Sequence, residues 1–218
     1  MAETHLVRAI IFVDFWNYTL NMQNFNPQFK TDWFAFPWAI AAAARECLHL
    51  PEELFRYEGM YVVGSYDQLS KSEINLRNWA QNTLTKVPGA FVDFKSRQKT
   101  QSGPRCIGPD HHEIANCPIC SSSMLGTREK GVDTQIVTQM LRCAWEGLYD
   151  VGILVSEDRD FVPAVDHLIS KGYKFIHARF PSKGFELRKH CWGEIDISKI
   201  CEKFQRTYKG PPPELAAQ

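Results

Sequence analysis

The stretch EGLYDVGILVSEDRDFVPAVDHLISKGYKFI, residues 146–176, decides the fold class of this chain. Its apolar run, Gly152–Ser156, has the length and composition of a strand buried on both faces. A helix follows over Phe161–Ser170 and ends before Gly172, because glycine favours the position just after a helix terminus. A second buried strand, Tyr173–Phe180, comes next. A strand, a helix and a strand in this order predict a parallel sheet covered by helices.

The same alternation extends over the rest of the chain. We predict three further strands over Arg8–Phe15, Gly59–Tyr66 and Gly89–Lys95. Ser70 and Glu73 have the spacing of a capping box at a helix start. The other predicted helices cover Trp33–His49, Ser70–Lys86, Lys130–Gly147, Lys183–His190 and Ser198–Phe204. The sequence therefore predicts an α/β, Rossmann-like fold of three layers with a mainly parallel five-stranded sheet, whose ligands bind beyond the carboxyl ends of the strands.

Composition narrows the class of protein. The 218 residues suffice for one domain, residues 1–210, and we expect a flexible tail over 211–218. Lysine plus arginine and aspartate plus glutamate both number 25, so any nucleic-acid binding would depend on local positive charge. No apolar run approaches the ~20 residues of a membrane span, and the N-terminus lacks the apolar core of a signal peptide. Seven cysteines, an odd number, argue against a disulfide framework, so we expect a reducing, cytoplasmic location.

Four aspartates fall at matching points of this topology. Asp14 closes the first strand, Asp158 and Asp160 follow the fourth strand, and Asp133 lies in the first turn of a predicted helix. If the first and fourth strands are neighbours, these carboxyl groups meet at one edge of the sheet. Two of them have alternative interpretations: Asp133 could be a favourable charge at a helix N-terminus, and Asp160 could cap the helix that follows it.

Carboxylates gathered in this way need a counterion. Four negative groups within a few ångströms repel one another, and some would take up protons. A hard divalent cation removes this penalty, and oxygen ligands favour Mg²⁺ or Mn²⁺. Such an ion can polarise a phosphoryl oxygen, activate water for in-line attack and stabilise the leaving oxygen. A phosphodiester is therefore the expected substrate.

Three ordered motifs carry a resemblance to a known family. They are Asp14-Phe-Trp-Asn17 after a strand, Lys130-Gly-Val-Asp133 opening a helix, and Ser156-Glu-Asp158-Arg-Asp160-Phe161 after another strand. Over residues 8–180, apart from one insertion, the chain resembles the NYN domain, a branch of the PIN-like nucleases. The resemblance implies a PIN-like fold, a Mg²⁺- or Mn²⁺-dependent site and endoribonuclease activity. It assigns metal-binding or water-activating catalytic roles to Asp14, Asp133, Asp158 and Asp160.

The resemblance also assigns supporting residues. Asn17 would position Asp14 or the phosphate, and the Ser156 hydroxyl would lie near the metal or the phosphate. The chain departs from the family pattern at Glu157, where a glycine is often found, and at Trp16, where smaller residues are common. Trp16 could stack on a base of the substrate, or it could pack beneath the neighbouring helix.

Residues 98–128 interrupt the α/β pattern. This insertion is rich in glycine, proline, serine, cysteine and histidine and has no sustained period, so it is functional, stapled or mobile. Its sequence Cys117-Pro-Ile-Cys120 is typical of a zinc knuckle. We predict that structural Zn²⁺, which would order a loop without its own core, is bound by Cys106, His112, Cys117 and Cys120, with His111 as the alternative histidine. A flexible loop with unligated thiols is the competing interpretation.

Positive side chains flank the acidic residues. Arg128 and Lys130 precede Asp133, and Arg159 lies between two predicted ligands, so these three basic residues and Trp16 are the predicted substrate contacts. The first hypothesis is a metal-dependent endonuclease that hydrolyses RNA, and the second is a non-catalytic nucleic-acid-binding module on the same fold. The retained aspartates favour the enzyme, and the resemblance favours RNA while leaving DNA open. A phosphate-handling α/β protein would need a nucleophilic aspartate paired with a lysine, and no such pair can be assigned. The oligomeric state is open, with a homodimer among the options.

Overall fold

A six-stranded parallel sheet forms the centre of the computed structural model, which describes residues 5–100, 103–106, 109–181 and 183–208. Its strands are β1 (Val7–Asp14), β2 (Phe55–Tyr66), β3 (Ala90–Ser96), β6 (Val151–Val155), β7 (Lys174–Arg179) and β8 (Gly193–Asp196). Their order across the sheet is β3-β2-β1-β6-β7-β8, and each neighbouring pair is parallel. The predicted parallel sheet is confirmed, with one strand more than expected. The tail predicted at 211–218 lies outside the described residues.

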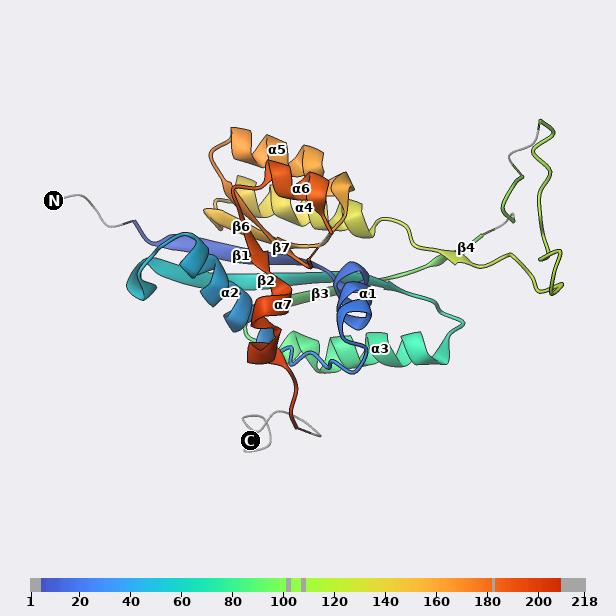
Figure 1. The fold of residues 1–218 in the computed structure, drawn as a ribbon, viewed down its shortest axis with the longest axis horizontal. Helices are drawn as coiled ribbons and strands as arrows, with labels where there is room; N and C mark the ends of the chain where they lie inside the picture. The colour runs from blue at the N-terminus through green and yellow to red at the C-terminus, as the bar shows by residue number, and fades with distance from the viewer. Residues whose placement is uncertain (1–4, 101–102, 107–108, 182, 209–218) are drawn as a thin grey trace.

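Helices cover both faces of this sheet, which gives the predicted three layers (Figure 1). The first face is covered by α1 (Phe15–Phe25), α2 (Phe36–Cys47), α3 (Lys71–Asn82) and α7 (Ile197–Ile200). The second face is covered by α4 (Val132–Trp145), α5 (Val162–Ser170) and α6 (Phe185–His190). The order and layers of these elements agree with an α/β, Rossmann-like fold.

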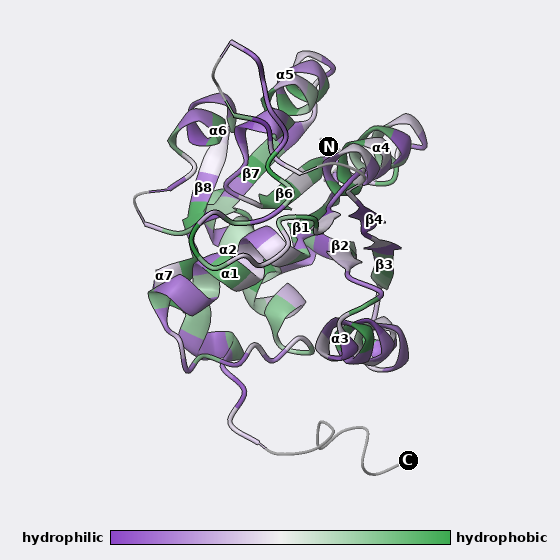
Figure 2. Ribbon diagram, turned by 90° about the vertical axis from the view of Figure 1, so that its right-hand side faces the viewer, coloured by the Kyte–Doolittle hydropathy of each residue, from purple (hydrophilic) through white to green (hydrophobic). Residues whose placement is uncertain are grey.

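Strand β1 builds an apolar core on each side of the sheet, because successive strand residues point to opposite faces. Ile11 and Val13 belong to the core under α1 and α2, and Ile10 and Phe12 belong to the core under α4 and α5. Viewed along the strands in Figure 2, hydrophobic colours concentrate on the sheet and on the inner sides of the helices. Continuous apolar sequence in the central strands is therefore explained by burial on both faces.

Ser70 caps α3 as the sequence predicts, but the second half of the capping box is absent. The Ser70 hydroxyl accepts a hydrogen bond from the Glu73 backbone N–H at 3.4 Å. The Glu73 carboxylate does not return to Ser70: it accepts from the Asp67 backbone N–H at 2.8 Å and from Arg97 at 3.3 Å. Glu73 thus ties the start of α3 to the segment that follows β3.

The strand order reverses between β1 and β6, and this point places the candidate site. The chain continues from β1 to β2 on one side, whereas β6 is followed by β7 on the other side. Val13 of β1 is paired with Val155 of β6, so Asp14 and Ser156 end adjacent strands. Ligands bind at this point of the carboxyl edge in parallel α/β sheets.

The insertion leaves the body of the protein through a short antiparallel hairpin of β4 (Gln98–Lys99) and β5 (Thr127–Arg128). Figure 1 shows the hairpin and the loops beyond it projecting from the carboxyl edge of the sheet. Isolated bridges pair Arg105 with Glu113 and Asn116 with Ser123, so the described part of the insertion contains two successive turns. Among the helices of the described chain, none combines the length and apolar character needed to cross a bilayer.

Candidate metal centre

Asp14 is a buried carboxyl group between β1 and α1. It is 5% exposed, and its side chain caps α1 by accepting a hydrogen bond from the Asn17 backbone N–H at 3.1 Å. Burial raises the pKa of Asp14 to about 7, against the opposing effect of this hydrogen bond. Negative charge on Asp133, Glu129 and Asp158 raises it further. Asp14 therefore lies within electrostatic reach of the other acidic residues.

Asp133, Asp158 and Asp160 form a group with the geometry of a metal site. Each offers one carboxylate oxygen, and these oxygens lie within 4.8 Å of one another. Burial raises the pKa of Asp133, and the charges of Asp158, Glu129 and Asp160 add to this effect. Three oxygen donors that destabilise one another's charge are suited to a hard divalent cation. Asp14 is not part of this closest group, although all four aspartates share the carboxyl edge.

The turn that carries Asp158 and Asp160 has its own internal cap. Asp158 begins a short 3-10 helix, η3 (Arg159–Phe161), and its Oδ1 accepts from the Asp160 backbone N–H at 2.9 Å. The next helix, α5, has no side-chain cap, so Asp160 does not serve as the N-cap that was its alternative interpretation. The Asp160 carboxylate instead points its oxygen toward Asp133 and Asp158.

Asn17 connects the end of β1 with the loop that follows β6. Its side-chain oxygen accepts from the Glu157 backbone N–H and from the Asn21 amide, both at 2.9 Å. Asn21 in turn accepts from the Lys183 ammonium at 2.6 Å. Because the Asn17 backbone also binds Asp14, one residue holds the end of β1 and the loop after β6 at a fixed separation. No sequence motif pointed to Asn21, which lies one helical turn from Asn17.

Ser156 is a buried residue at the start of the loop after β6. It is 3% exposed, and its hydroxyl accepts from the Asp158 backbone N–H at 3.2 Å. Its carbonyl oxygen is bonded to the buried His177 Nε2 at 2.8 Å. In this structure Ser156 therefore orders the loop through backbone contacts, whereas the sequence predicts a hydroxyl near metal or phosphate.

Glu129 is an acidic neighbour that the sequence interpretation missed. Its carboxylate accepts a hydrogen bond from the buried Ser65 hydroxyl, which also accepts from Arg97 Nε at 3.0 Å. Negative charge on Glu129 contributes to the raised pKa values of both Asp14 and Asp133. Its position four residues before Asp133, at the end of an irregular segment, carried no recognisable motif.

Trp16 makes contacts within the protein. Its indole N–H donates to the Ser65 carbonyl oxygen at 2.6 Å, and the Arg97 guanidinium lies 5.4 Å from the ring centroid. Phe15 meets the same ring edge-on, with the centroids 5.4 Å apart. These are the contacts of the packing alternative, because both the polar tip and a ring face of Trp16 are engaged by the protein.

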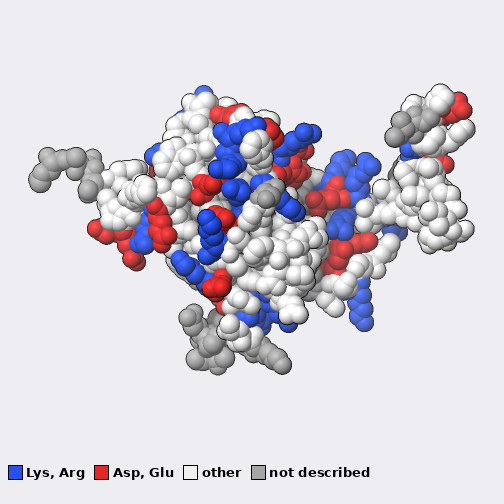
Figure 3. Space-filling model, in the orientation of Figure 1, with Lys and Arg blue, Asp and Glu red and all other residues white. Residues whose placement is uncertain are grey.

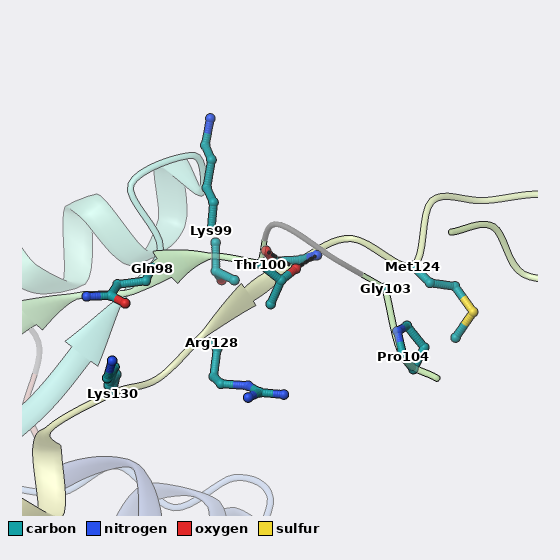
Figure 4. A pocket seen from close by; sticks show the side chains of 10 residues that line it. Gln98, Lys99, Thr100, Gly103, Pro104, Met124, Arg128 and Lys130 are labelled. Carbon is teal, nitrogen blue, oxygen red and sulfur yellow. Dashed lines mark hydrogen bonds between the residues drawn. The ribbon is translucent and has the colours of Figure 1, made fainter. Parts of the chain in front are cut away.

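Arg128 and Lys130 line a hollow of about 770 Å³ between the β4–β5 hairpin and the insertion. In Figure 4 their side chains lie on one side of the hollow, while Lys99 points away from them. The lining residues include three basic side chains and no acidic one. The exposed Arg159 lines a second hollow of about 600 Å³, together with Asp160, Glu186 and His190. On the face shown in Figure 3, basic and acidic side chains are interspersed, so positive charge is local.

No three of the predicted zinc ligands have mutually close donor atoms in the described part of the chain, although the Cys117 and Cys120 side chains contact each other. Among the described residues, the aspartate trio is the one group of three or more metal-ligating side chains with mutually close donor atoms. The Cys117–Cys120 turn is nevertheless ordered: the Ser121 N–H donates to the Cys117 carbonyl at 2.9 Å, and Ser121 has a φ of 57°. Hydrogen bonds from the Ser122 side chain and backbone, and one with the Cys117 side chain, lower the pKa of the Cys120 thiol to about 7. The turn therefore favours a thiolate, which is the form that binds zinc.

The fold and the group of aspartates together define the class: a Rossmann-like α/β protein with a candidate divalent-metal site at the point where strand order reverses. The sequence profile of the NYN domain matches residues 65–206, more than half of the chain, and the chain belongs to the NYN domain family. NYN domains are generally nucleases with a PIN-like fold. The match includes Asp133, Asp158 and Asp160, and it begins after Asp14 and Asn17.

Comparison with solved structures supports the same fold. The crystal structure of a protein of unknown function from Vibrio parahaemolyticus is similar to this chain, with a TM-score of 0.59 and 16% sequence identity. The similarity covers 94% of this chain and 100% of that one. A search of curated proteins found no match to the chain.

Proposed function

We propose that this protein is a metal-dependent endoribonuclease. The observation that carries the proposal is the aspartate trio, whose carboxylate oxygens lie within 4.8 Å of one another at the carboxyl edge of a nuclease-family fold. Asp133, Asp158 and Asp160 would hold Mg²⁺ or Mn²⁺, because these ions prefer carboxylate oxygens. When bound, the ion would polarise the phosphoryl group and lower the pKa of a water molecule.

The protein's own residues would then orient the reacting groups. Asp14 adds either a fourth carboxylate ligand or the acceptor for the proton that the attacking water loses. Asn17 fixes Asp14 and the loop of Asp158 relative to each other, through its backbone and its side chain. Positioning of this kind is a main source of rate enhancement, since misplacement by about 1 Å can cost ~100-fold.

The substrate proposed is RNA, with its phosphate backbone along the hollow that Arg128 and Lys130 line. Lys130 lies three residues from Asp133, so a strand bound there would lead toward the acidic site. Arg159 lines a second hollow beside Asp160. Backbone contacts from such side chains position a nucleic acid without reading its sequence.

The test is a cleavage assay on labelled RNA and DNA of the same sequence, with Mg²⁺, with Mn²⁺ and with EDTA. The wild-type protein is compared with Asp158→Asn and with Glu202→Gln, a control at an exposed acidic residue after α7. We expect internal cleavage of RNA that EDTA abolishes, loss of activity by at least ~100-fold in Asp158→Asn and no loss in the control. Binding of RNA without cleavage under every metal condition would instead identify a non-catalytic binding module, and cleavage of DNA alone would change the substrate.

A further inference from the structure

Glu157 occupies an unusual position between Ser156 and the first ligand of the loop after β6. Its side chain is 9% exposed and turns inward, away from the aspartate trio. One oxygen, Oε1, accepts from the Phe180 backbone N–H at 2.6 Å. The other, Oε2, lies 3.6 Å from His177 Nε2 and has no hydrogen-bond partner. A carboxyl group is thus buried directly beneath the loop that presents Asp158 and Asp160.

The surrounding backbone leaves room for this carboxyl group. Gly184 has a φ of +63°, and a Cβ atom there would overlap both Glu157 Oε2 and the imidazole of His177. Glycine is therefore required at this position for two reasons, the left-handed conformation and the contact with Glu157. The turn before α6 is thus in close contact with the Glu157 side chain.

Stability as an ion pair does not explain this arrangement. His177 is fully buried and its Nε2 is bonded to the Ser156 carbonyl, so its imidazole serves as a neutral donor. Burial lowers the pKa of His177 to about 4, and burial raises the pKa of Glu157. Burying a polar atom without a partner costs free energy. What Glu157 does provide is a bond from the loop to the end of β7.

We propose that Glu157 is a positioning residue, a strut that fixes the Asp158–Asp160 loop against Phe180 and the turn at Gly184. This inference rests on the proposed metal site. The loop is held on one side by Asn17, through the Glu157 backbone N–H, and on the other by the Glu157 side chain. With both anchors present, the backbone and the side chain of Glu157 are held in place, so the residue directly before Asp158 is fixed before the cation binds. Supporting contacts of this kind typically change metal affinity by about 10- to 100-fold.

The test measures Mn²⁺ binding by calorimetric titration, and amide hydrogen exchange in EDTA, for four proteins: wild type, Glu157→Ala, Glu157→Gln and the exposed control Glu202→Ala. We expect Glu157→Ala to bind Mn²⁺ about 10- to 100-fold more weakly, with faster exchange at Phe180 and across the loop. Glu157→Gln should recover most of the affinity, because its amide oxygen can still accept from Phe180. The control should match the wild type.

The outcomes separate this inference from the proposed function. If Glu157→Ala binds Mn²⁺ with wild-type affinity and its amide hydrogen exchange is unchanged, the proposed positioning role of Glu157 is wrong. No Mn²⁺ binding by the wild type would overturn the proposed metal site, and the exchange rates in EDTA would then decide alone whether Glu157 holds the loop. Should Glu157→Ala fail to fold, Glu157→Gln gives the decision: weakened binding in a folded Gln variant would show that the contact with Phe180 is not what positions the loop.

Discussion

Replacing Asp14 by asparagine should stabilise the metal-free protein at high pH, although it removes a residue of the proposed site. Asparagine keeps the size of the side chain and remains a good N-cap, so the bond from the Asn17 N–H to position 14 can persist. What disappears is a buried carboxyl group surrounded by like charges from Asp133, Glu129 and Asp158. The metal-free fold therefore no longer has to bury a charged carboxylate, and it also loses repulsion between like charges.

The size and sign of this effect follow from the pKa of Asp14. The value rises from 3.8 to about 7 on folding, and this difference corresponds to ~4 kcal/mol when the group is fully ionised. Because the folded-state pKa lies above the unfolded-state value, the native protein binds more protons between about pH 4 and about pH 7. Wild-type stability is thus retained below this interval and lost as the pH rises through it. The Asp14→Asn variant lacks this loss, so its advantage should grow from near zero to ~4 kcal/mol at most.

Urea denaturation in EDTA across this pH interval measures the difference directly. The matched control is Asp196→Asn, because Asp196 likewise ends a strand, β8, and caps the following helix by accepting from the Ser198 N–H at 3.0 Å. Added Mn²⁺ should reduce the advantage of the variant at high pH, since a ligand at 100 times its Kd stabilises the native state by about 2.7 kcal/mol and the variant would bind it poorly. A difference between Asp14→Asn and wild type that stays constant with pH would refute the reasoning.

Three further predictions concern other parts of the molecule. Lys130→Glu should weaken RNA binding and flatten its salt dependence in fluorescence anisotropy, and an unchanged slope would exclude a phosphate contact at Lys130. Gly152→Ala should lower the free energy of unfolding by about 1–3 kcal/mol, because a Cβ there would meet the Phe175 ring, and an unshifted urea midpoint would contradict this packing. Elemental analysis should find one Zn²⁺ per chain in the wild type and none after joint Cys117→Ser and Cys120→Ser substitution, whereas a zinc-free wild type would remove the zinc prediction.

The layers of the fold were predictable because burial on both faces of a strand leaves a continuous apolar run in the sequence. Strand β8, with the sequence GEID, was missed because it is four residues long and lies at the edge of the sheet, where polar residues are tolerated. Helix α1 was also missed, although Phe15, Tyr18 and Met22 recur on one face at helical spacing and are buried. Its asparagines and aromatic residues concealed that signal, because neither type favours helices strongly.

The sequence predicted the acidic residues of the site, but it did not predict the side-chain contacts that hold them in place. Asp14, Asp158 and Asp160 follow strands, so topology alone places them at one edge of the sheet. Glu129 is brought there by a bond to Ser65, which is distant in sequence, and no local pattern reports such a contact. The same holds for the bond between Glu157 and Phe180. Side-chain networks depend on tertiary packing, and a single sequence does not encode them in a local period.

Three of the four aspartates lie at helix starts, and this position is compatible with both of their interpretations, helix capping and metal binding. Asp14 caps α1, Asp158 caps η3, and Asp133 lies in the first turn of α4. Backbone N–H groups and the positive end of a helix stabilise a nearby carboxylate, by about 0.3–1 kcal/mol for an exposed group. Each helix start therefore offsets part of the repulsion that gathering the carboxylates creates. A residue that caps a helix can thus also be a ligand, and the capping role makes it possible for the protein to hold clustered negative charge before any cation arrives.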